Sequence, residues 1–336
     1  MYFIFSEEED RQTNEIIDRL LFHDKEVCRF NDKFSEDEIA LLKGQLFKAK
    51  KAVGESNTHS NQNIAIFHRR PFHGIVDQLL DKELSEQDIV YPRFSEGSTY
   101  FKYLRSNYIS HQSRFLDAVL NDPEYTIGKI DYRLNKYEVL VLAEKAGMTV
   151  PPTLISGEKD EVKEFFLTHG EDIITKSLYN IIPLSGALEE GFNIKCYTQR
   201  IVSLENLPDT FYPTLFQKNI KKKYELRVFY LDKECFAAAI LSQDKDRSQQ
   251  DYRNADRSVP NRIVPYNVSP KLKSQIINLM NSVGLNTGSL DIMMGQDGIP
   301  YFLEINPIGQ YGWINSACNY GISHALANKM IEFHGE

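Results

Sequence analysis

Two carboxylates and one amide near the end of the chain have types and a spacing that suit a metal site. Asp297-Gly298 stands between two apolar runs, which predicts a hairpin with these two residues as its turn. Counting outward places Asp291 opposite Glu304, with facing Cβ atoms roughly 5 Å apart, and Asn306 on the same face. Because facing carboxylates repel each other and suit Mg²⁺ beside nucleotide phosphates, the hairpin indicates a magnesium site. The alternative is a solvated strand face with incidental acids.

Three cations earlier in the chain stand where they could contact phosphate. Lys136 falls in the first turn of a predicted helix, whose backbone N–H groups and dipole attract anions. Lys176 ends an apolar strand, where it could point into a cleft. Arg227 shares one face of an alternating strand with Glu225, and an arginine can bind phosphate or carboxylate through two N–H groups. The alternatives are solvated lysines and a cross-strand salt bridge of Arg227.

Further basic residues lie on both sides of the strand that carries Glu225. Lys218 and residues 221–223 form a cluster that is either a solvated turn or a docking patch for an acidic peptide. The polar segment 243–262 carries four arginines: Arg247, Arg253, Arg257 and Arg262. Basic residues in loops are mostly solvated, so only some of these arginines are expected to reach a cleft.

The elements that must position these residues follow from hydrophobic periodicity. Strands at 2–6, 26–30 and 63–69 alternate with helices, the first at 14–22, which predicts a small α/β unit with parallel strands. A long amphipathic helix is expected over 100–120.

The remaining two thirds of the chain also alternate between strands and helices. Asn135 is the predicted N-cap of a helix that ends before Gly147. Segment 177–195 predicts a hairpin or a flap. The other expected elements are strands at 153–156, 172–176, 214–218, 224–231, 234–242 and 262–266, and helices at 161–168, after Ser269-Pro270, and near 322–333.

Composition narrows the classes of protein. A chain of 336 residues suits two or three domains, and its net charge of -8 argues against a nucleic-acid partner. No apolar run is long enough to cross a membrane, and the N-terminus lacks the basic start of a signal peptide. The four cysteines stand far apart, which excludes the usual zinc motifs and fits a reducing cytoplasm.

The order of these motifs resembles that of the ATP-grasp ligases over roughly residues 125–333. The most specific match is 304–307, Glu-Ile-Asn-Pro, with Asp291 thirteen residues before Glu304. Within the superfamily the chain resembles the graspetide (microviridin-type) peptide ligases, and most of all the peptide maturases of grasp-with-spasm systems. The stretches that carry this resemblance are 133–136, 215–218, 223–230, 239–243, 251–254, 260–266, 285–291 and 304–310, with a weak extension at 66–70.

The resemblance implies an α/β (α+β) architecture with the ATP-grasp fold in three parts. These are an N-terminal pre-ATP-grasp α/β domain with a linking helix (1–122), a central subdomain (123–215) and a C-terminal subdomain with the metal-binding hairpin (216–336). ATP would lie between two antiparallel sheets. One departure is the stretch 177–186, which is glycine-poor where many ATP-grasp enzymes have a glycine-rich flap.

The resemblance also implies roles for single residues. Lys136 and Lys176 would contact phosphates, and Glu225 would reach toward the ribose. The hinge beside the adenine would consist of Gln217, Lys218 and Ile220. The Mg²⁺ ligands would be Asp291, Glu304 and Asn306. The γ-phosphate or acyl-phosphate side would be formed by Arg227, Arg253, Asn254 and Arg262.

The function implied is an ATP- and Mg²⁺-dependent carboxylate ligase. It would activate Asp or Glu side chains of a ribosomally made precursor peptide and close ω-ester or ω-amide rings with Ser, Thr or Lys side chains. The partner would be a precursor with a leader and an acidic, hydroxyl-rich core, in the cytoplasm, and a homodimer is left open. One alternative is an ATP-grasp ligase that adds an amino acid to a peptide or small carboxylate. Another is a peptide-binding protein without turnover.

Overall fold

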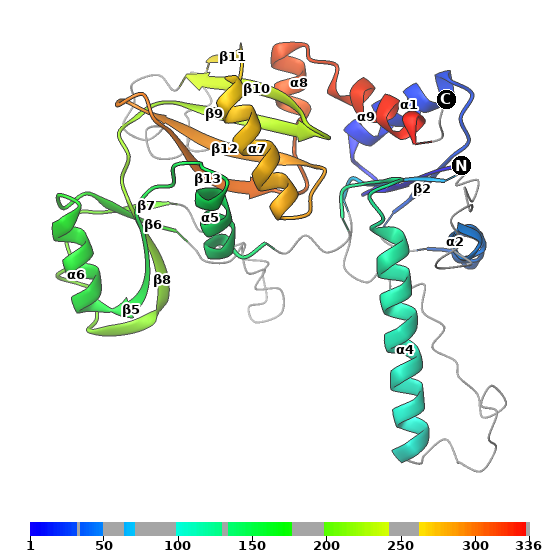
Figure 1. The fold of residues 1–336 in the computed structure, drawn as a ribbon, viewed down its shortest axis with the longest axis horizontal. Helices are drawn as coiled ribbons and strands as arrows, with labels where there is room; N and C mark the ends of the chain where they lie inside the picture. The colour runs from blue at the N-terminus through cyan, green and yellow to red at the C-terminus, as the bar shows by residue number, and fades with distance from the viewer. Residues whose placement is uncertain are drawn as a thin grey trace. The chain divides into compact units, whose positions relative to one another are not determined.

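The computed structural model describes residues 1–31, 34–49, 64–70, 99–129, 134–176, 198–241 and 262–333. The chain divides into two compact units (Figure 1). Unit 1 comprises Met1–Tyr132 and Gly321–Glu336, and unit 2 comprises Arg133–Tyr320. The division at 1–122, 123–215 and 216–336 stays a prediction.

Unit 1 contains a parallel sheet, as the alternation of strands and helices predicts. Its order is β2-β1-β3-β4, and each neighbouring pair is parallel. The strands are β1 (Tyr2–Phe5), β2 (Val27–Phe30), β3 (Ala65–His68) and β4 (Thr126–Ile127). β1 is buried along its whole length, because strands in the middle of a parallel sheet are covered on both faces.

The described helices of unit 1 are α1 (Arg11–Phe22), α2 (Glu36–Ala49), α4 (Thr99–Leu120) and α9 (Ile322–Glu332). The prediction of α1 starts three residues late, because Asp10 caps the helix by accepting the N–H groups of Gln12 and Thr13. Helix α9 packs against α1, and Ser323 donates a hydrogen bond to Glu15 at 2.6 Å. The last helix of the chain therefore belongs to unit 1, although it follows the elements of unit 2 in sequence.

The first sheet of unit 2 has the order β5-β8-β6-β7, with antiparallel neighbours. Its strands are β5 (Thr153–Glu158), β6 (Ile173–Lys176), β7 (Gln199–Ile201) and β8 (Thr210–Lys218). Helix α6 (Lys159–Thr168) buries Val162 and Phe166 against Ile173 and Phe216 of this sheet. The predicted flap at 177–195 lies outside the described residues.

The second sheet of unit 2 has the order β11-β10-β9-β12-β13, again antiparallel. Its strands are β9 (Lys222–Leu231), β10 (Glu234–Leu241), β11 (Arg262–Tyr266), β12 (Thr287–Gly295) and β13 (Pro300–Asn306). Helices α5 (Lys136–Lys145) and α7 (Pro270–Ser282) cover one face, as Figure 1 shows. Leu226, Leu290 and Phe302 point into this core. The alternation of side chains turns residues such as Arg227 and Asp291 to the opposite face, beside apolar residues such as Ala238.

The turn of the β12–β13 hairpin is one residue longer than predicted. The N–H of Gly295 donates to Ile299 at 2.9 Å, so the loop consists of residues 296–298, and the prediction of a turn formed by Asp297 and Gly298 alone is wrong. Gly298 has a positive φ of 81°, and its N–H donates to Gly295 at 3.0 Å. A three-residue hairpin loop needs a left-handed residue at this place, which explains why the glycine stands there.

A register shift further along β13 compensates for the longer turn. Ile292 pairs with Phe302, but Asp291 pairs with Glu304, which leaves Leu303 as the extra residue. A bulge of this kind returns the side chains beyond it to the expected face. The predicted pairing of Asp291 with Glu304 is therefore confirmed.

Candidate functional site

The face of the five-stranded sheet opposite α5 and α7 carries a row of charged residues. Asp291 on β12 lies directly between Arg227 on β9 and Glu304 on β13. Glu225 lies two residues from Arg227 and pairs with Met293, so it shares that face. We call Glu225, Arg227, Asp291 and Glu304 the carboxylate row.

Arg227 is held from two sides. Its Nε lies 3.0 Å from Oδ1 of Asp291, and the side chains are only 8% and 18% exposed. Its guanidinium carbon lies 5.8 Å from the ring centroid of Trp313, which belongs to α8 (Gly312–Cys318). The cross-strand salt bridge that is the alternative for Arg227 is thus present, and the aromatic contact was not predicted from the sequence.

Glu225 has a cationic partner of its own. Nζ of Lys222 lies 2.5 Å from Oε1 of Glu225, and both side chains are largely buried. Lys222 was expected only as one member of the basic cluster. Its neighbours Lys221 and Lys223 are exposed, as a solvated turn would have them.

Lys176 lies within electrostatic reach of the carboxylate row and of Lys136. Burial lowers the pKa of Lys176, the positive charge of Lys136 lowers it further, and the charges of Glu304, Asp291 and Glu225 raise it. Lys176 ends β6, and Lys136 is the first residue of α5. Asn135 caps α5 as predicted, by accepting the N–H groups of Tyr137 and Glu138 at 2.9 and 3.2 Å. Elements from three parts of unit 2 therefore converge on one charged site.

The residues at the end of β13 fit a magnesium ion by their chemistry. Asp291 and Glu304 face each other, and Asn306 follows two residues later, opposite Ser289. Oδ1 of Asn306 accepts the N–H of Ile308 at 3.1 Å and retains a second lone pair. Among the described residues there is no cluster of three or more His, Cys, Asp or Glu side chains suited to a metal. Two carboxylates and an amide are the sparse protein ligand set that Mg²⁺ takes when phosphates complete its shell.

The three residues predicted for the adenine hinge lie at the end of β8 and just beyond it. Gln217 is 2% exposed, and its Nε2 donates to Oγ1 of Thr153 at 2.9 Å, so its side chain packs within its own sheet. The N–H of Lys218 donates to Pro152 at 2.9 Å, and its side chain is exposed. Ile220 is half-buried. The side chain of Gln217 thus braces β5 against β8.

Of the remaining predicted residues, Arg262 is not brought to the carboxylate row. Arg262 is exposed at the start of β11 and pairs with Leu241. The next residue, Ile263, pairs with Ile240, which in turn pairs with Glu225, so Ile263 and not Arg262 shares the face of Glu225. Side chains alternate between faces, so Arg262 stands on the face that α5 and α7 cover. Arg253 and Asn254 lie outside the described residues.

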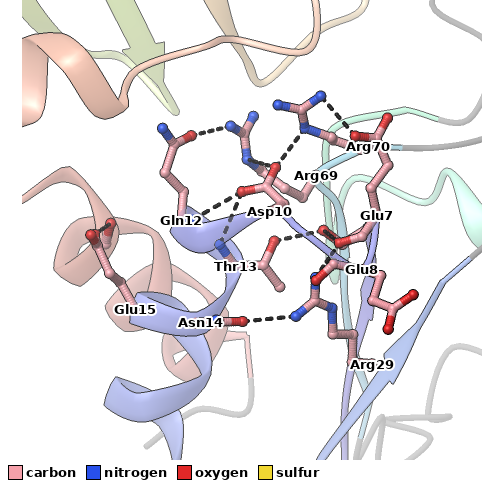
Figure 2. Close-up of polar contacts among 12 residues, drawn as sticks. Glu7, Glu8, Asp10, Gln12, Thr13, Asn14, Glu15, Arg29, Arg69 and Arg70 are labelled. Carbon is pink, nitrogen blue, oxygen red and sulfur yellow. Dashed lines mark hydrogen bonds and ion pairs between the residues drawn. The ribbon is translucent and has the colours of Figure 1, made fainter.

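Unit 1 contains a second charged cluster, which the sequence did not reveal (Figure 2). Asp10 caps α1 and also pairs with Nε of Arg69 at 3.3 Å and Nε of Arg70 at 2.6 Å. Arg69 is 1% exposed and donates to Gln12. Arg70 also pairs with Glu7 at 2.9 Å. We call these residues the Asp10 cluster.

Comparison with solved structures finds similar chains over the whole length. One is the macrocyclase MdnC from Microcystis aeruginosa MRC, bound with precursor peptide MdnA, at 22% identity and a TM-score of 0.64, with 99% of both chains covered. A second is a RiPP-associated ATP-grasp ligase from Chryseobacterium gregarium, in complex with ADP and a leader and core peptide, at 21% identity and a TM-score of 0.68, covering 98% of this chain and 96% of that one. A third is the ATP-grasp ligase PsnB, complexed with minimal precursor, Mg and ADP, at 18% identity and a TM-score of 0.62, covering 99% and 97%.

Neither the family models nor the curated protein sequences give a match to this chain. None of the helices described here is both long and apolar enough to cross a membrane. The full-length likeness to solved structures agrees with the mixed α/β sheets and with the order of the motifs. The chain therefore has the fold of the ATP-grasp ligases, as its sequence predicts.

Proposed function

We propose that the protein is an ATP-dependent ligase that activates side-chain carboxylates of a precursor peptide and closes them into macrocycles. The observation that carries this proposal is the approach of Lys176 both to the carboxylate row and to Lys136. Two lysines suit the phosphates of a nucleotide, and two facing carboxylates suit the metal ion that accompanies it. The similar chains MdnC and PsnB are described as bound to precursor peptides, which supports a peptide as the second substrate.

The nucleotide is proposed to lie between the two sheets of unit 2. Lys136 adds its charge to the N-terminus of α5, where the helix dipole favours phosphate oxygens. Lys176 would contact the same phosphates from the end of β6. Glu225 would accept a hydrogen bond from the ribose, and Gln217, Lys218 and Ile220 would border the adenine, chiefly through their backbone.

The metal is proposed to be held by Asp291, Glu304 and Asn306. When bound, Mg²⁺ neutralises charge on the ATP phosphates during phosphoryl transfer. Arg227 would hold the attacking carboxylate or the acyl phosphate that it becomes. Arg253 and Asn254 stay weaker candidates for this side of the site, whereas Arg262 is no longer one because it stands on the opposite face of the sheet.

The proposed reaction has two steps. A carboxylate oxygen of the peptide attacks the γ-phosphorus of ATP, ADP leaves, and an acyl phosphate forms. A hydroxyl or amine of the same peptide then attacks the acyl carbon, loses its proton, and phosphate leaves. The peptide thus loses one water for each ring, and ATP is converted to ADP and phosphate. We propose that this takes place in the cytoplasm, where ATP is available.

The test is mass spectrometry of the precursor peptide encoded beside the gene, incubated with the protein, ATP and Mg²⁺. The expected result is the loss of one or more waters, which Glu304→Gln abolishes. Glu234→Gln serves as the matched control, because Glu234 is an exposed carboxylate on β10 of the same sheet. A gain equal to one amino acid would instead support a ligase that extends peptides. An unchanged mass while ATP is consumed would contradict ring closure.

A further inference from the structure

Trp313 contacts the guanidinium of Arg227, and the geometry points to a role for this ring that rests on the proposed function. We propose that Trp313 is a positioning residue, which keeps the Arg227 guanidinium beside the site when a metal ion takes Asp291 as its ligand. Arg227 would then exchange its carboxylate partner for an anionic oxygen of the nucleotide. Binding of the metal and aiming of the arginine would be coupled through Asp291.

The contact itself is well defined. The guanidinium carbon of Arg227 lies 5.8 Å from the centroid of the Trp313 ring, within the range of a cation–π interaction. Arg227 is 8% exposed, so water competes little with this contact. Tryptophan gives the strongest interaction of this kind among the aromatic residues. Asp291 and Trp313 together therefore restrict where the guanidinium can go.

The chain after Asn306 is built to bring Trp313 to this place. The N–H of Gly309 donates to the carbonyl of Asn306 at 3.0 Å, and Gly309 has a positive φ of 59°. A Cβ on Gly309 would lie 2.8 Å from the ring of Phe229, so only glycine fits there without a shift. Tyr311 is buried, and its ring packs on Phe229 at 4.9 Å between centroids. The turn that carries a proposed metal ligand thus also fixes the start of α8.

Asp291 lies between a cation and a second carboxylate. It is paired with Arg227 in the structure, and it also faces Glu304 across β12 and β13. A divalent ion held by Asp291 and Glu304 would repel the guanidinium and weaken the ion pair. Without a second contact the arginine would then be free to turn away from the site. The ring of Trp313 offers that contact, since a π face attracts the cation without taking up its N–H donors.

The first arm of the test uses the fact that Trp313 is the only tryptophan of the chain. Its emission therefore reports on the surroundings of this one ring. The expected result is a shift of the emission maximum in Arg227→Met relative to the unsubstituted protein, measured without ligand. Arg227→Lys serves as a second variant that keeps a charge, should the methionine variant fold poorly. An identical emission spectrum in both variants would overturn the contact.

The second arm adds Mg²⁺ and ADP and measures both emission and affinity by calorimetry. We expect the emission of the unsubstituted protein to change as Mg²⁺–ADP saturates the site, and the change to vanish in Arg227→Met. Trp313→Leu should weaken Mg²⁺–ADP binding about tenfold, and Trp313→Phe should restore most of it, because a phenyl ring still attracts a cation. Tyr212→Leu is the matched control, since Tyr212 is 81% exposed on β8.

A double-mutant cycle decides whether Trp313 acts through Arg227. In the Arg227→Met background, Trp313→Leu should change the affinity for Mg²⁺–ADP by less than about twofold. Additive effects of the two substitutions would overturn the positioning role of Trp313 and leave the proposed ligase function in place. Unchanged emission on saturation with Mg²⁺–ADP would likewise overturn the positioning role alone. Absence of any Mg²⁺–ADP binding by calorimetry would overturn both, which separates the two failures.

Discussion

Each unit of the molecule holds a largely buried arginine paired with an aspartate, and the surroundings of the two pairs differ. Asp10 in unit 1 serves two arginines and two backbone N–H groups of α1, so its charge is shared among partners of one sign. Asp291 in unit 2 faces Arg227 on one strand and Glu304 on the other. The first arrangement stabilises the fold that contains it. The second places like charges together, which costs stability unless a cation binds.

The two units also differ in what surrounds a buried basic side chain and shifts its pKa. Burial lowers the pKa of His68 in unit 1 to about 4, and this imidazole, with Nε2 2.8 Å from the carbonyl oxygen of Leu120, stacks on Phe5. Lys176 in unit 2 has its pKa lowered by burial as well, but three carboxylates act against that shift. A neutral histidine needs no counterion, whereas a lysine among carboxylates is suited to meet an anion. Charge in unit 1 is therefore structural, and charge in unit 2 is proposed to serve ligands.

The largest effect is expected from Asp10→Ala. It leaves Arg69, which is 1% exposed, without its carboxylate, and it removes the cap of α1. Losing one partner of a buried pair and a helix cap should together lower the free energy of unfolding of unit 1 by about 4 kcal/mol. Hydrogen exchange of peptides from β1 and β3 measures this loss. Glu7→Ala is the matched control, because Glu7 pairs with Arg70 at the surface and should cost under about 1 kcal/mol.

Arg227→Met should give the next largest effect, with a dependence on Mg²⁺ that Asp10→Ala lacks. Removing the arginine takes away the cation that pairs with Asp291 and leaves Asp291 facing Glu304, which should cost unit 2 about 3 kcal/mol. Millimolar Mg²⁺ should return part of that loss, because the ion replaces the missing positive charge. Chemical unfolding followed by Trp313 emission measures both quantities.

Arg200→Met is the control for this substitution. Arg200 also pairs with an aspartate in unit 2, at 2.8 Å from Asp172, but its side chain is 45% exposed. Its loss should cost under about 1 kcal/mol and respond to no metal. A Mg²⁺ response of equal size in both variants would contradict the assignment of the ion to Asp291 and Glu304.

His68→Phe should change how the stability of unit 1 depends on pH. The folded pKa of about 4 lies below the ordinary value of 6.5, so the unfolded state binds more protons between these two values. The free energy of unfolding therefore falls as pH drops through that window, by about 2 kcal/mol between pH 7 and pH 5. Phenylalanine keeps the stacking on Phe5 and removes this part of the pH dependence.

Hydrogen exchange in β3 as a function of pH measures the difference, after correction for intrinsic exchange rates. His111→Phe is the control, since His111 is exposed on α4. Equal pH dependence in His68→Phe and the unsubstituted protein would show that other groups govern acid stability in unit 1.

Much of this arrangement follows from local sequence, and the rest depends on contacts between distant segments. The cap at Asn135 and the pairing of Asp291 with Glu304 follow from helix chemistry and strand alternation. The bulge at Leu303 cannot be predicted in this way, because it is visible only in how β12 and β13 pair with each other. Trp313 is close in sequence to Asn306, but its contact with Arg227 depends on how α8 returns to the sheet.

The Asp10 cluster and the convergence on Lys176 are both beyond local reasoning. Asp10 and Arg69 are far apart in sequence and meet only because β1 and β3 are neighbours in a parallel sheet. Lys176 approaches the carboxylate row because two separate sheets of unit 2 meet there. Lys136 and Lys176 were predicted as phosphate contacts through the resemblance to the ATP-grasp ligases. Their spacing in the sequence alone does not predict how close they lie in the fold.

The smallest predicted effect has the opposite sign and therefore tests the comparison most directly. Glu304→Gln removes one of two facing carboxylates and keeps the shape of the side chain. In the absence of a divalent ion it should raise the free energy of unfolding of unit 2 by about 0.5 kcal/mol, since like charges directly opposite each other are destabilising. The same substitution should abolish the Mg²⁺-dependent part of nucleotide affinity. Chemical unfolding with and without Mg²⁺ measures the first effect, and calorimetry with ADP measures the second.

Glu234→Gln at the exposed start of β10 should leave both quantities unchanged. A loss of stability in Glu304→Gln without metal would mean that Glu304 supports the fold as Asp10 does, and the two clusters would then be of one kind. A gain in stability joined to a loss of Mg²⁺ affinity would separate them, because a residue that weakens its own fold is retained only where a ligand needs it.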